Sequence, residues 1–568
     1  MLAVAAPMLL AYNTSPSSTF LNQALACGGW GLFLWTLATL PGGIGLAPRE
    51  GMRRLWPALL PVGLVALAAL SSTVFGGLPG SLGASALALL ACAALALWVG
   101  ASLTHAGRLA AVMPLWCVAL VVAGVLSSLV SLVQVFAPGW ADGVWVAATS
   151  LPGRASGNLR QPNHLSTLVL WSLVALAWVQ SARRDLSVFT SLLALLMVGA
   201  VALSASRTGL VGVCLLGLWG LVDRRMPARS RWLLMAMPLM YGVVWYALTH
   251  FGTSLEHPFG GAARFTTGGD ISSSRFAIWS DTLGLITRHP WFGVGFGEFN
   301  RAWSLTPFPH RPVAFFDHTH NLPLQFAVEL GLPLSALLVG LLAWALWRAH
   351  TAAGRAAADD VVGLRCAFVV VLLVAVHSQL EYPLWYAYFL LPTAFALGLC
   401  LGAGPRAVSA PAASPLRSWV LQACGAALVA GSVQAVFDYW KVVVIFSPGA
   451  GAAPLAERIE AGERSVYFAH HAHYAAATVA PRPSMAMPSF QVASHYLLDT
   501  RLMLAWAKAY AEAGDLDRAR HLADRLREFR NAASVPFFEA CAEPPPADEP
   551  PPFQCRPAER TLDDRDFR

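Results

Sequence analysis

The sequence carries little charge. Only 12% of its 568 residues are Asp, Glu, Lys or Arg, whereas 56% are hydrophobic. Soluble globular proteins carry about 25% charged residues, because polar groups must cover their surface. The shortage of charge therefore excludes a soluble globule and predicts a membrane protein.

Two further absences narrow the class of protein. The N-terminal segment lacks the charged region and the small-residue cleavage site of a signal peptide, so we expect no cleaved leader. The net charge is +7, but the positive residues are dispersed among hydrophobic segments and form no patch. We therefore expect no nucleic-acid partner.

Long apolar runs make up most of the chain as far as about residue 446. Each is long enough to cross the hydrocarbon layer as a helix, so they predict an all-α fold, a polytopic bundle of about 12 to 13 membrane helices. The first segment, 1–11, is short for a span. The other expected spans are 20–40, 56–75, 82–104, 112–136, 164–181, 186–204, 208–222, 231–250, 321–347, 361–380, 383–401 and 417–446.

The positions of the arginines predict the orientation of the bundle. Arginines collect in the cytoplasmic loops of membrane proteins, and here they fall in alternate loops. The other loops, including 137–163 and 251–320, then face outward, with the N-terminus in the cytoplasm. The arginines that predict this orientation are Arg49, Arg53, Arg54, Arg108, Arg183, Arg184, Arg224, Arg225, Arg229, Arg231, Arg348, Arg355 and Arg406.

The composition changes after residue 446, where the charge density becomes ordinary. We expect a membrane domain at 1–446, with 251–320 as a large outward loop, and an outward helical domain at 447–568. Residues 500–529 predict two amphipathic helices joined at Gly514 and Asp515, similar to one tetratricopeptide hairpin. The Pro-rich tail that follows is expected to be extended.

The loop 251–320 contains one segment with helical periodicity. Phe276, Trp279, Leu283 and Ile286 are spaced to form one apolar face. They predict a helix that lies near the outer surface, followed by a Gly-rich turn.

Seven of the nine cysteines lie within apolar runs, where they act as small core residues. Cys541 and Cys555 instead lie in the polar tail. In an oxidising compartment this pair could close a disulfide that contributes about 3 kcal/mol. Two free thiols are the alternative.

Three arginines lie in the outward segments. Arg207 stands between two spans with almost no loop, and Arg160 and Arg275 are on the same expected side. A guanidinium offers paired donors that suit phosphate oxygens, so the three predict an anion site. The structural alternative is an arginine that reaches lipid phosphate or pairs with a carboxylate.

His320 and Asn321 begin an expected span behind Asp317 and His318. An imidazole accepts a proton near neutral pH, so His320 is a candidate general base, with a helix cap or interface residue as the alternative. His318 and His320 with Asp317 also suggest metal ligands. The spacing is unspecific and no further carboxylate or Cys pair completes a site, so we expect no metal.

Uncharged polar residues precede the expected span at 164. Gln161, Asn163 and His164 offer donors and acceptors that suit sugar hydroxyls, or that cap the helix, and both uses are compatible. Another outward turn carries Tyr382 and Tyr386, which are candidates for an interfacial aromatic belt or for a sugar platform.

Five stretches together resemble a known family. The stretches are "GNLRQPNHL", "SASRTGL", "SRFAIWSDTLGLITRHPWFGVGFGEF", "HTHNLPLQFAVELGLP" and "EYPLWYAYFLLP". In this order they are similar to the O-antigen ligase and polymerase superfamily of bacterial inner membranes. The QPNH stretch and the extension after the last span more narrowly resemble the PglL-type protein O-oligosaccharyltransferases. The similarity runs from about residue 12 to about residue 530, and the abbreviated first span departs from the family pattern.

The resemblance implies roles for individual residues. His320 matches the essential histidine of the family, and Arg207 and Arg275 match the arginines that hold the diphosphate of the donor. Gln161 and Tyr382 fall where this branch has required polar residues, although the tyrosine could instead align with Tyr386 or Tyr388. Members of the family need neither a metal nor a nucleotide cofactor.

The implied reaction is en bloc transfer of a glycan from undecaprenyl diphosphate to Ser or Thr hydroxyls of periplasmic acceptor proteins. His320 would take the hydroxyl proton, which predicts single displacement with inversion at the anomeric carbon. The same residues would serve a ligase acting on lipid A core or a polymerase, because only the acceptor differs. A transporter or flippase is disfavoured, since ionisable residues at mid-membrane and broken helices in matching halves are lacking.

Overall fold

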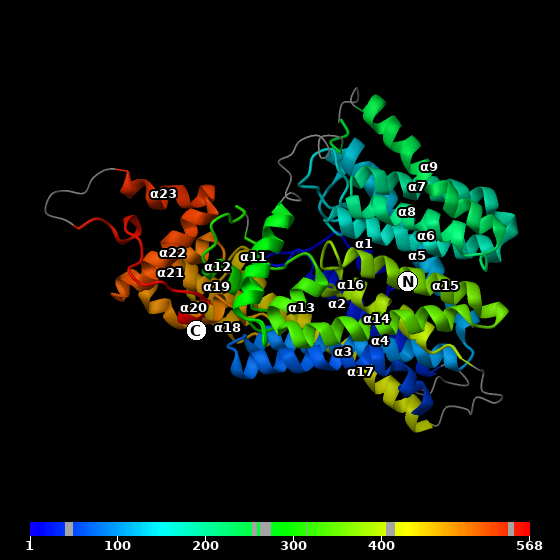
Figure 1. Cartoon of the computed structure of the whole chain (residues 1–568), viewed down its shortest axis with the longest axis horizontal. Coiled ribbons are helices and arrows are strands. Elements are labelled where there is room, and N and C mark those ends of the chain that lie inside the picture. Colours follow the sequence, from blue (N-terminus) through cyan, green and yellow to red (C-terminus); the bar gives the residue numbers. More distant parts are fainter. Residues whose placement is uncertain are drawn as a thin grey trace. The chain divides into compact units, whose positions relative to one another are not determined.

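The computed structural model describes residues 1–39, 49–252, 258–261, 274–313, 315–404, 415–542 and 550–567, and these contain helices and no strand. The α-helices labelled in Figure 1 and their neighbours have the following bounds: α1 (Ala5–Leu9), α2 (Phe20–Thr39), α3 (Arg49–Phe75), α4 (Gly80–His105), α5 (Leu109–Phe136), α6 (Pro162–Ala182), α7 (Ser187–Ser204), α8 (Arg207–Val222), α9 (Ala228–Phe251), α11 (Ser274–Arg288), α12 (Phe299–Leu305), α13 (Leu322–Leu330), α14 (Leu332–Gly354), α15 (Ala358–His377), α16 (Ala387–Leu401), α17 (Pro415–Phe446), α18 (Leu455–Glu463), α19 (Ala469–Val479), α20 (Met487–Ala493), α21 (Thr500–Glu512), α22 (Leu516–Phe529) and α23 (Val535–Phe538).

Nine of the described helices are long and apolar enough to cross a membrane: α3, α4, α5, α6, α7, α9, α14, α15 and α17. Two shorter apolar helices, α8 and α16, occupy other expected spans, and the 20-residue α2 occupies the expected span at 20–40. The predicted polytopic all-α bundle is confirmed. Helix α1 has five residues, far fewer than the roughly 20 that a span requires. Arg406, used above for orientation, lies outside the described residues.

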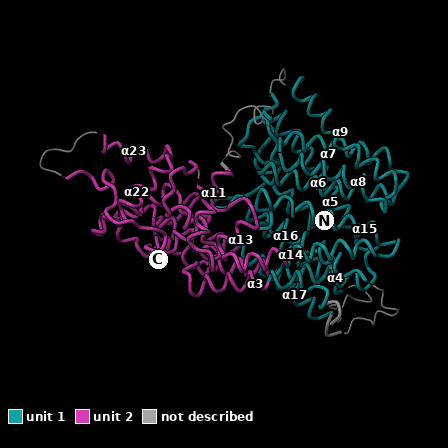
Figure 2. Tube along the Cα trace, in the orientation of Figure 1, with its two compact units in different colours: residues 1–62, 91–269, 341–436 teal, residues 63–90, 270–340, 437–568 magenta. Residues whose placement is uncertain are grey.

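The chain packs into two compact units, shown in different colours in Figure 2. Unit 1 comprises 1–62, 91–269 and 341–436. Unit 2 comprises 63–90, 270–340 and 437–568. Unit 2 therefore combines the C-terminal region with residues 270–320 of the expected outward loop and with the ends of α3, α4, α14 and α17.

The expected span at 321–347 is two helices, because the chain breaks at Gly331. This glycine has φ +80°, and a Cβ there would lie 2.2 Å from the Trp291 carbonyl oxygen. Gly293 is equally close to the backbone at the end of α13. A Cβ on Gly293 would lie 2.3 Å from the Glu329 carbonyl carbon. Only glycines permit two backbones to cross this closely. The membrane span is therefore α14, and α13 is a separate short helix in front of it.

Helix α11 forms where the apolar periodicity predicts a helix, but only part of the predicted apolar face is buried. Phe276 and Leu283 are 75% and 56% exposed. Ile286 of that face is buried, and the buried side of the helix also includes Ile278 and Leu285, which are fully buried. The unit 2 core receives these two side chains because the helix packs beside α12 and α13, a tertiary contact that helical spacing alone does not reveal.

The predicted helical hairpin at 500–529 is confirmed as α21 and α22. Asp499 caps α21 by accepting the Leu502 N–H, and Asp515 caps α22 by accepting the Arg518 N–H. Gly514, with φ +83°, makes the turn between them. The inner faces of the two helices bury Trp506 in the core of unit 2.

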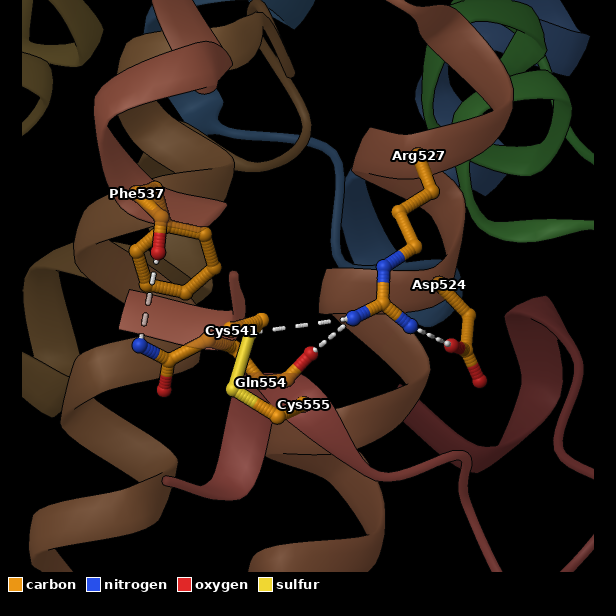
Figure 3. Close-up of a disulfide and its surroundings, with 6 residues drawn as sticks. All are labelled: Asp524, Arg527, Phe537, Cys541, Gln554 and Cys555. Carbon is orange, nitrogen blue, oxygen red and sulfur yellow. Dashed lines mark hydrogen bonds and ion pairs between the residues drawn. A yellow bond between two sulfur atoms is a disulfide. The ribbon is translucent and has the colours of Figure 1, made fainter. Parts of the chain in front are cut away.

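A disulfide joins Cys541 to Cys555 across 14 positions of the chain, and Figure 3 shows its surroundings. The Arg527 guanidinium donates a hydrogen bond to the Gln554 carbonyl at 2.6 Å, and it lies 3.7 Å from the Asp524 carboxylate. The disulfide therefore joins two parts of the tail after α23 to each other. The Arg527 hydrogen bond attaches this tail to α22.

Two adjacent histidines are buried within unit 2. His470 Nδ1 lies 2.9 Å from the Ser81 hydroxyl, and both His470 and His471 pack against the Tyr496 ring. Burial lowers the pKa of His471 to about 4, and burial also lowers the pKa of His470 well below its usual value. Both imidazoles are therefore neutral at pH 7, and protonation opposes folding.

We predict that this unit loses stability in acid. A histidine with a folded pKa near 4 and an unfolded pKa near 6.5 stabilises the fold fully above pH 6.5, and this stability is lost as the pH falls toward 4. For His471 alone the loss at pH 5 is about 2 kcal/mol. Thermal unfolding of the detergent-solubilised protein at pH 7.5 and pH 5 measures it. His471→Phe should reduce the difference, and equal melting temperatures of the wild type at both pH values would contradict the prediction.

We also predict that removing the disulfide loosens the tail. The double substitution Cys541→Ser with Cys555→Ser removes a constraint on the unfolded chain that is worth about 3 kcal/mol for a loop of this length. Limited proteolysis should then cleave the tail sooner, while Cys424→Ser, which replaces a free cysteine, leaves the rate unchanged. Equal cleavage rates for the double variant and the wild type would show that the cross-link does not secure the tail.

Candidate functional site

Six of the predicted site residues lie in unit 1, and the first of them begin α6. Gln161 is the N-cap, and its side-chain oxygen accepts the His164 backbone N–H at 2.8 Å. Pro162 follows at the first helical position, where no N–H is required. Arg160, immediately before the cap, has φ +56°. Such a conformation costs a non-glycine residue about 1 to 3 kcal/mol.

Helix α8 begins in the same way. Ser206 is the N-cap and accepts the Gly209 N–H at 3.0 Å, while Ala205 before it has φ +47°. Arg207 is the first helical residue and is exposed. The N-terminal turn of a helix carries unsatisfied N–H groups and a partial positive charge. Together with a guanidinium, such a turn favours an anionic group.

Asn163 connects the start of α6 to two other segments of unit 1. Its amide nitrogen donates to the Glu381 carboxylate at 2.9 Å, and its amide oxygen accepts the Ser206 hydroxyl at 2.6 Å. All three side chains are at most 8% exposed. The stretches at 160–166, 203–209 and 377–389 are therefore held together by buried polar contacts. The predicted substrate-binding residue Asn163 has both of its amide atoms committed to protein partners.

Arg160 attaches the N-terminal segment to this region. Its guanidinium donates to the Ser18 carbonyl at 3.3 Å and also to the Ala11 carbonyl. Arg154, which the motif analysis did not single out, donates to the Ser204 carbonyl at 3.1 and 3.3 Å. Both arginines donate hydrogen bonds to backbone carbonyls that lack a partner within helices or loops.

His164 and Tyr382 belong to an aromatic cluster. The His164 ring is 2% exposed and lies 4.6 Å from the Tyr386 ring and 5.1 Å from the Phe389 ring, centroid to centroid. Tyr382 is half-buried and stacks on Tyr386 at 6.1 Å. His164 is thus a core residue of unit 1, whereas the partly exposed Tyr382 lies at the edge of the cluster.

The remaining predicted residues, Arg275, His320 and Asn321, lie in unit 2. His320 has φ +56° and Asn321 is the N-cap of α13, accepting the Leu324 N–H at 2.9 Å. This is the third helix start with a left-handed residue directly before a capping side chain. The His320 ring is half-buried and packs edge to face against Phe316 at 5.7 Å.

The residue before His320 is held on both sides of its backbone. Thr319 donates its N–H to the Gln325 side chain at 2.8 Å, and its carbonyl accepts the Trp279 indole N–H at 2.9 Å. Trp279 lies one turn after Arg275 on α11. The helix that carries Arg275 and the loop that carries His320 are therefore directly hydrogen-bonded within unit 2.

Asp317 and His318 form a local ion pair, with His318 Nδ1 3.1 Å from the Asp317 carboxylate. Burial acts to raise the pKa of Asp317, but the charge and hydrogen bond of His318 outweigh it and hold the pKa at about 2. Asp317 is consequently ionised at neutral pH. No group of three His, Cys, Asp or Glu side chains placed to bind a metal ion occurs among the described residues.

Sequence reasoning missed several residues that shape these loops. Gln134 of α5 accepts the Ser156 and Gly157 N–H groups and donates to two carbonyls, so it supports the loop before α6. Its signal was a lone amide in an apolar span, where a polar side chain needs an internal partner. Trp279 and Gln325 had no such signal, because aromatics and amides are common in amphipathic helices.

These features define the class: a multi-pass helical membrane protein with polar side chains gathered where particular helices begin. Family models match three parts of the chain: "Protein glycosylation ligase" at 155–178, "O-Antigen ligase" at 192–339, and "Virulence factor membrane-bound polymerase, C-terminal" at 366–534. The first covers Arg160 to His164 and the second covers Arg207, Arg275 and His320.

Two curated proteins from Acinetobacter baylyi are similar to this chain. A general O-oligosaccharyltransferase is 28% identical over 291 residues, 47% of this chain and 48% of the relative. A ComP-specific O-oligosaccharyltransferase is 26% identical over 262 residues, 44% of each. The alignments thus span about half the length of each relative. The predicted resemblance to the O-antigen ligase superfamily and to protein O-oligosaccharyltransferases is confirmed.

We predict that the buried polar contacts of unit 1 stabilise its fold. Ser206→Ala removes the α8 cap and leaves the Asn163 amide oxygen without this donor, which should cost about 1 to 3 kcal/mol. The thermal stability of the purified protein measures the loss. Ser191→Ala, which removes a hydroxyl bonded only within its own helix, is the matched control. Similar melting temperatures for the two variants would contradict a special role for Ser206.

Proposed function

We propose that the protein is a glycosyltransferase that moves a preassembled glycan from a polyprenyl-diphosphate lipid to Ser or Thr hydroxyls of periplasmic proteins. The observation that carries the proposal is the match of 155–178 to protein glycosylation ligases, in the stretch that contains the α6 start. The two O-oligosaccharyltransferase relatives support the same acceptor class.

In this proposal two arginines stabilise the leaving group. A diphosphate leaves without protonation when fixed positive groups compensate the charge that develops on it. Arg207 and Arg275 supply such charge, and the N-terminal turn of α8 adds its unsatisfied N–H groups beside Arg207. Loss of one preorganised contact of this kind costs about 3 kcal/mol, or roughly a hundredfold in rate.

His320 is the proposed general base. A serine or threonine hydroxyl is a weak nucleophile until a base takes its proton in the transition state. The acceptor oxygen then forms a bond to the anomeric carbon while the bond to the diphosphate breaks on the opposite face, so the configuration inverts. The resemblance implies that neither a metal nor a nucleotide takes part.

Three of the remaining predicted residues are proposed to contact the glycan directly. Gln161, Tyr382 and Asn321 are half-buried, so each combines a fixed position with an accessible surface. Arg160, Asn163 and His164 support them from the loop and the core. The protein would reside in the bacterial inner membrane with its N-terminus in the cytoplasm and with 251–320 and the C-terminal region in the periplasm, consistent with the disulfide.

A second acceptor class has its own support. Residues 192–339 match O-antigen ligases and residues 366–534 match a polymerase C-terminal region. A ligase acting on lipid A core, or a polymerase, would use the same histidine and arginines on a sugar hydroxyl. Only the acceptor distinguishes these activities from transfer to protein.

We predict that His320→Ala lowers transfer by roughly 10² to 10⁴-fold, because the acceptor proton then has no base. The chain is produced with a lipid-linked glycan pathway and a panel of periplasmic proteins, and glycan on protein and on lipid A is measured. His310→Ala removes an exposed imidazole of the same unit and is the matched control. Unchanged transfer in His320→Ala would remove this residue from the mechanism, and glycan on lipid A alone would favour the ligase.

A further inference from the structure

Thr319, directly before the candidate base, is restrained by several hydrogen bonds. It is fully buried, and three polar groups of this residue have partners in unit 2. Its N–H is donated to Gln325 and its carbonyl accepts from Trp279, while its hydroxyl donates to the Asn321 carbonyl at 2.9 Å. The hydrogen bonds therefore come from α11, from α13 and from the loop itself.

The Gln325 side chain is in turn held by its own helix. Its amide nitrogen donates to the Glu329 carboxylate at 2.9 Å, one turn further along α13, and both side chains are at most 6% exposed. The end of α13 is fixed independently, because the Val294 and Gly295 N–H groups donate to the Val328 and Glu329 carbonyls at 2.9 Å. A chain of hydrogen bonds thus runs from the end of α13 to the backbone directly before His320.

We propose that Trp279 and Gln325 are positioning residues that fix the direction of the His320 imidazole, an inference that rests on the proposed function. His320 adopts a left-handed backbone conformation that a non-glycine residue does not keep without surrounding restraints. The two side chains supply these restraints at both peptide groups of Thr319. Without these two hydrogen bonds the loop relaxes. The His320 imidazole then no longer points toward the acceptor hydroxyl whose proton it takes.

Trp279 has a second consequence because it shares α11 with Arg275. The indole hydrogen bond is a direct link between the helix that carries this arginine and the loop that carries the base. Loss of the bond should disturb the orientation of both groups in the transition state. A displacement of about 1 Å is enough to lower a rate by as much as a hundredfold.

The test removes each hydrogen bond while keeping an aromatic ring at position 279 and a side chain of similar size at position 325. Trp279→Phe removes the indole N–H, and Gln325→Leu removes the acceptor for Thr319. We expect each variant to lower kcat for glycan transfer about tenfold, with KM for the acceptor changed less than threefold. The double substitution Gln325→Glu with Glu329→Gln exchanges the two partners, keeps an oxygen acceptor for the Thr319 N–H and retains the amide–carboxylate contact, so it should recover most of kcat.

Trp303→Phe is the matched control. Trp303 is a buried indole of the same unit whose N–H has no hydrogen-bond partner among the described residues. The same substitution there creates a packing defect without removing a bond to the His320 loop. This control should lower the melting temperature and leave kcat within threefold of wild type.

Hydrogen exchange supplies a readout that does not depend on activity. The Thr319 amide should exchange about tenfold faster in Gln325→Leu, because its acceptor is gone. Faster exchange with a lower kcat supports the positioning role. Faster exchange with an unchanged kcat, unchanged exchange, or an equal loss of kcat in Trp303→Phe would overturn it. A wild-type protein that transfers no glycan would instead contradict the proposed function, and the positioning role would fall with it.

Discussion

Backbone N–H groups that are shielded from water need an internal acceptor, and several helix starts of this protein are built around that constraint. The first four N–H groups of a helix have no intrahelical acceptor. At α6, α8 and α13 a polar side chain fills part of this need, and the three caps are Gln161, Ser206 and Asn321. Each cap is followed by an apolar helix, so the polarity of the chain collects at the points where these helices begin.

The capping geometry also determines the positions of the candidate functional residues relative to the helices. At each of these helix starts the residue before the cap has a positive φ, which turns the chain sharply away from the helix axis. Arg160 and His320 occupy that position, and Arg207 is the first residue of its helix. Side chains at such positions are attached to a rigid element while staying outside its apolar face. The same arrangement that satisfies the backbone therefore presents cations and an imidazole at fixed places.

Some of the predicted site residues pair with other protein groups and are not available to contact substrate. Asn163 commits both of its amide atoms to Glu381 and Ser206, and His164 lies within an aromatic cluster. Their chemistry serves the packing of unit 1. In unit 2, Thr319 plays a comparable part, since its neighbours restrain the backbone beside the candidate base. Asn163 and Thr319 thus use their polar groups as partners for other parts of the protein, because a buried polar group without a partner is costly.

The sequence by itself determined the all-α class, the apolar spans, the hairpin at 500–529 and the helix starts, because these depend on periodicity and on local capping chemistry. It also identified His320 and Arg207 as candidates, since polar residues in so apolar a chain stand out. Only the tertiary structure decided which face of α11 is buried and that the span expected at 321–347 breaks at Gly331. The same holds for the contact between Trp279 and Thr319, which lie 40 residues apart. These depend on contacts between distant segments, and no local spacing encodes them.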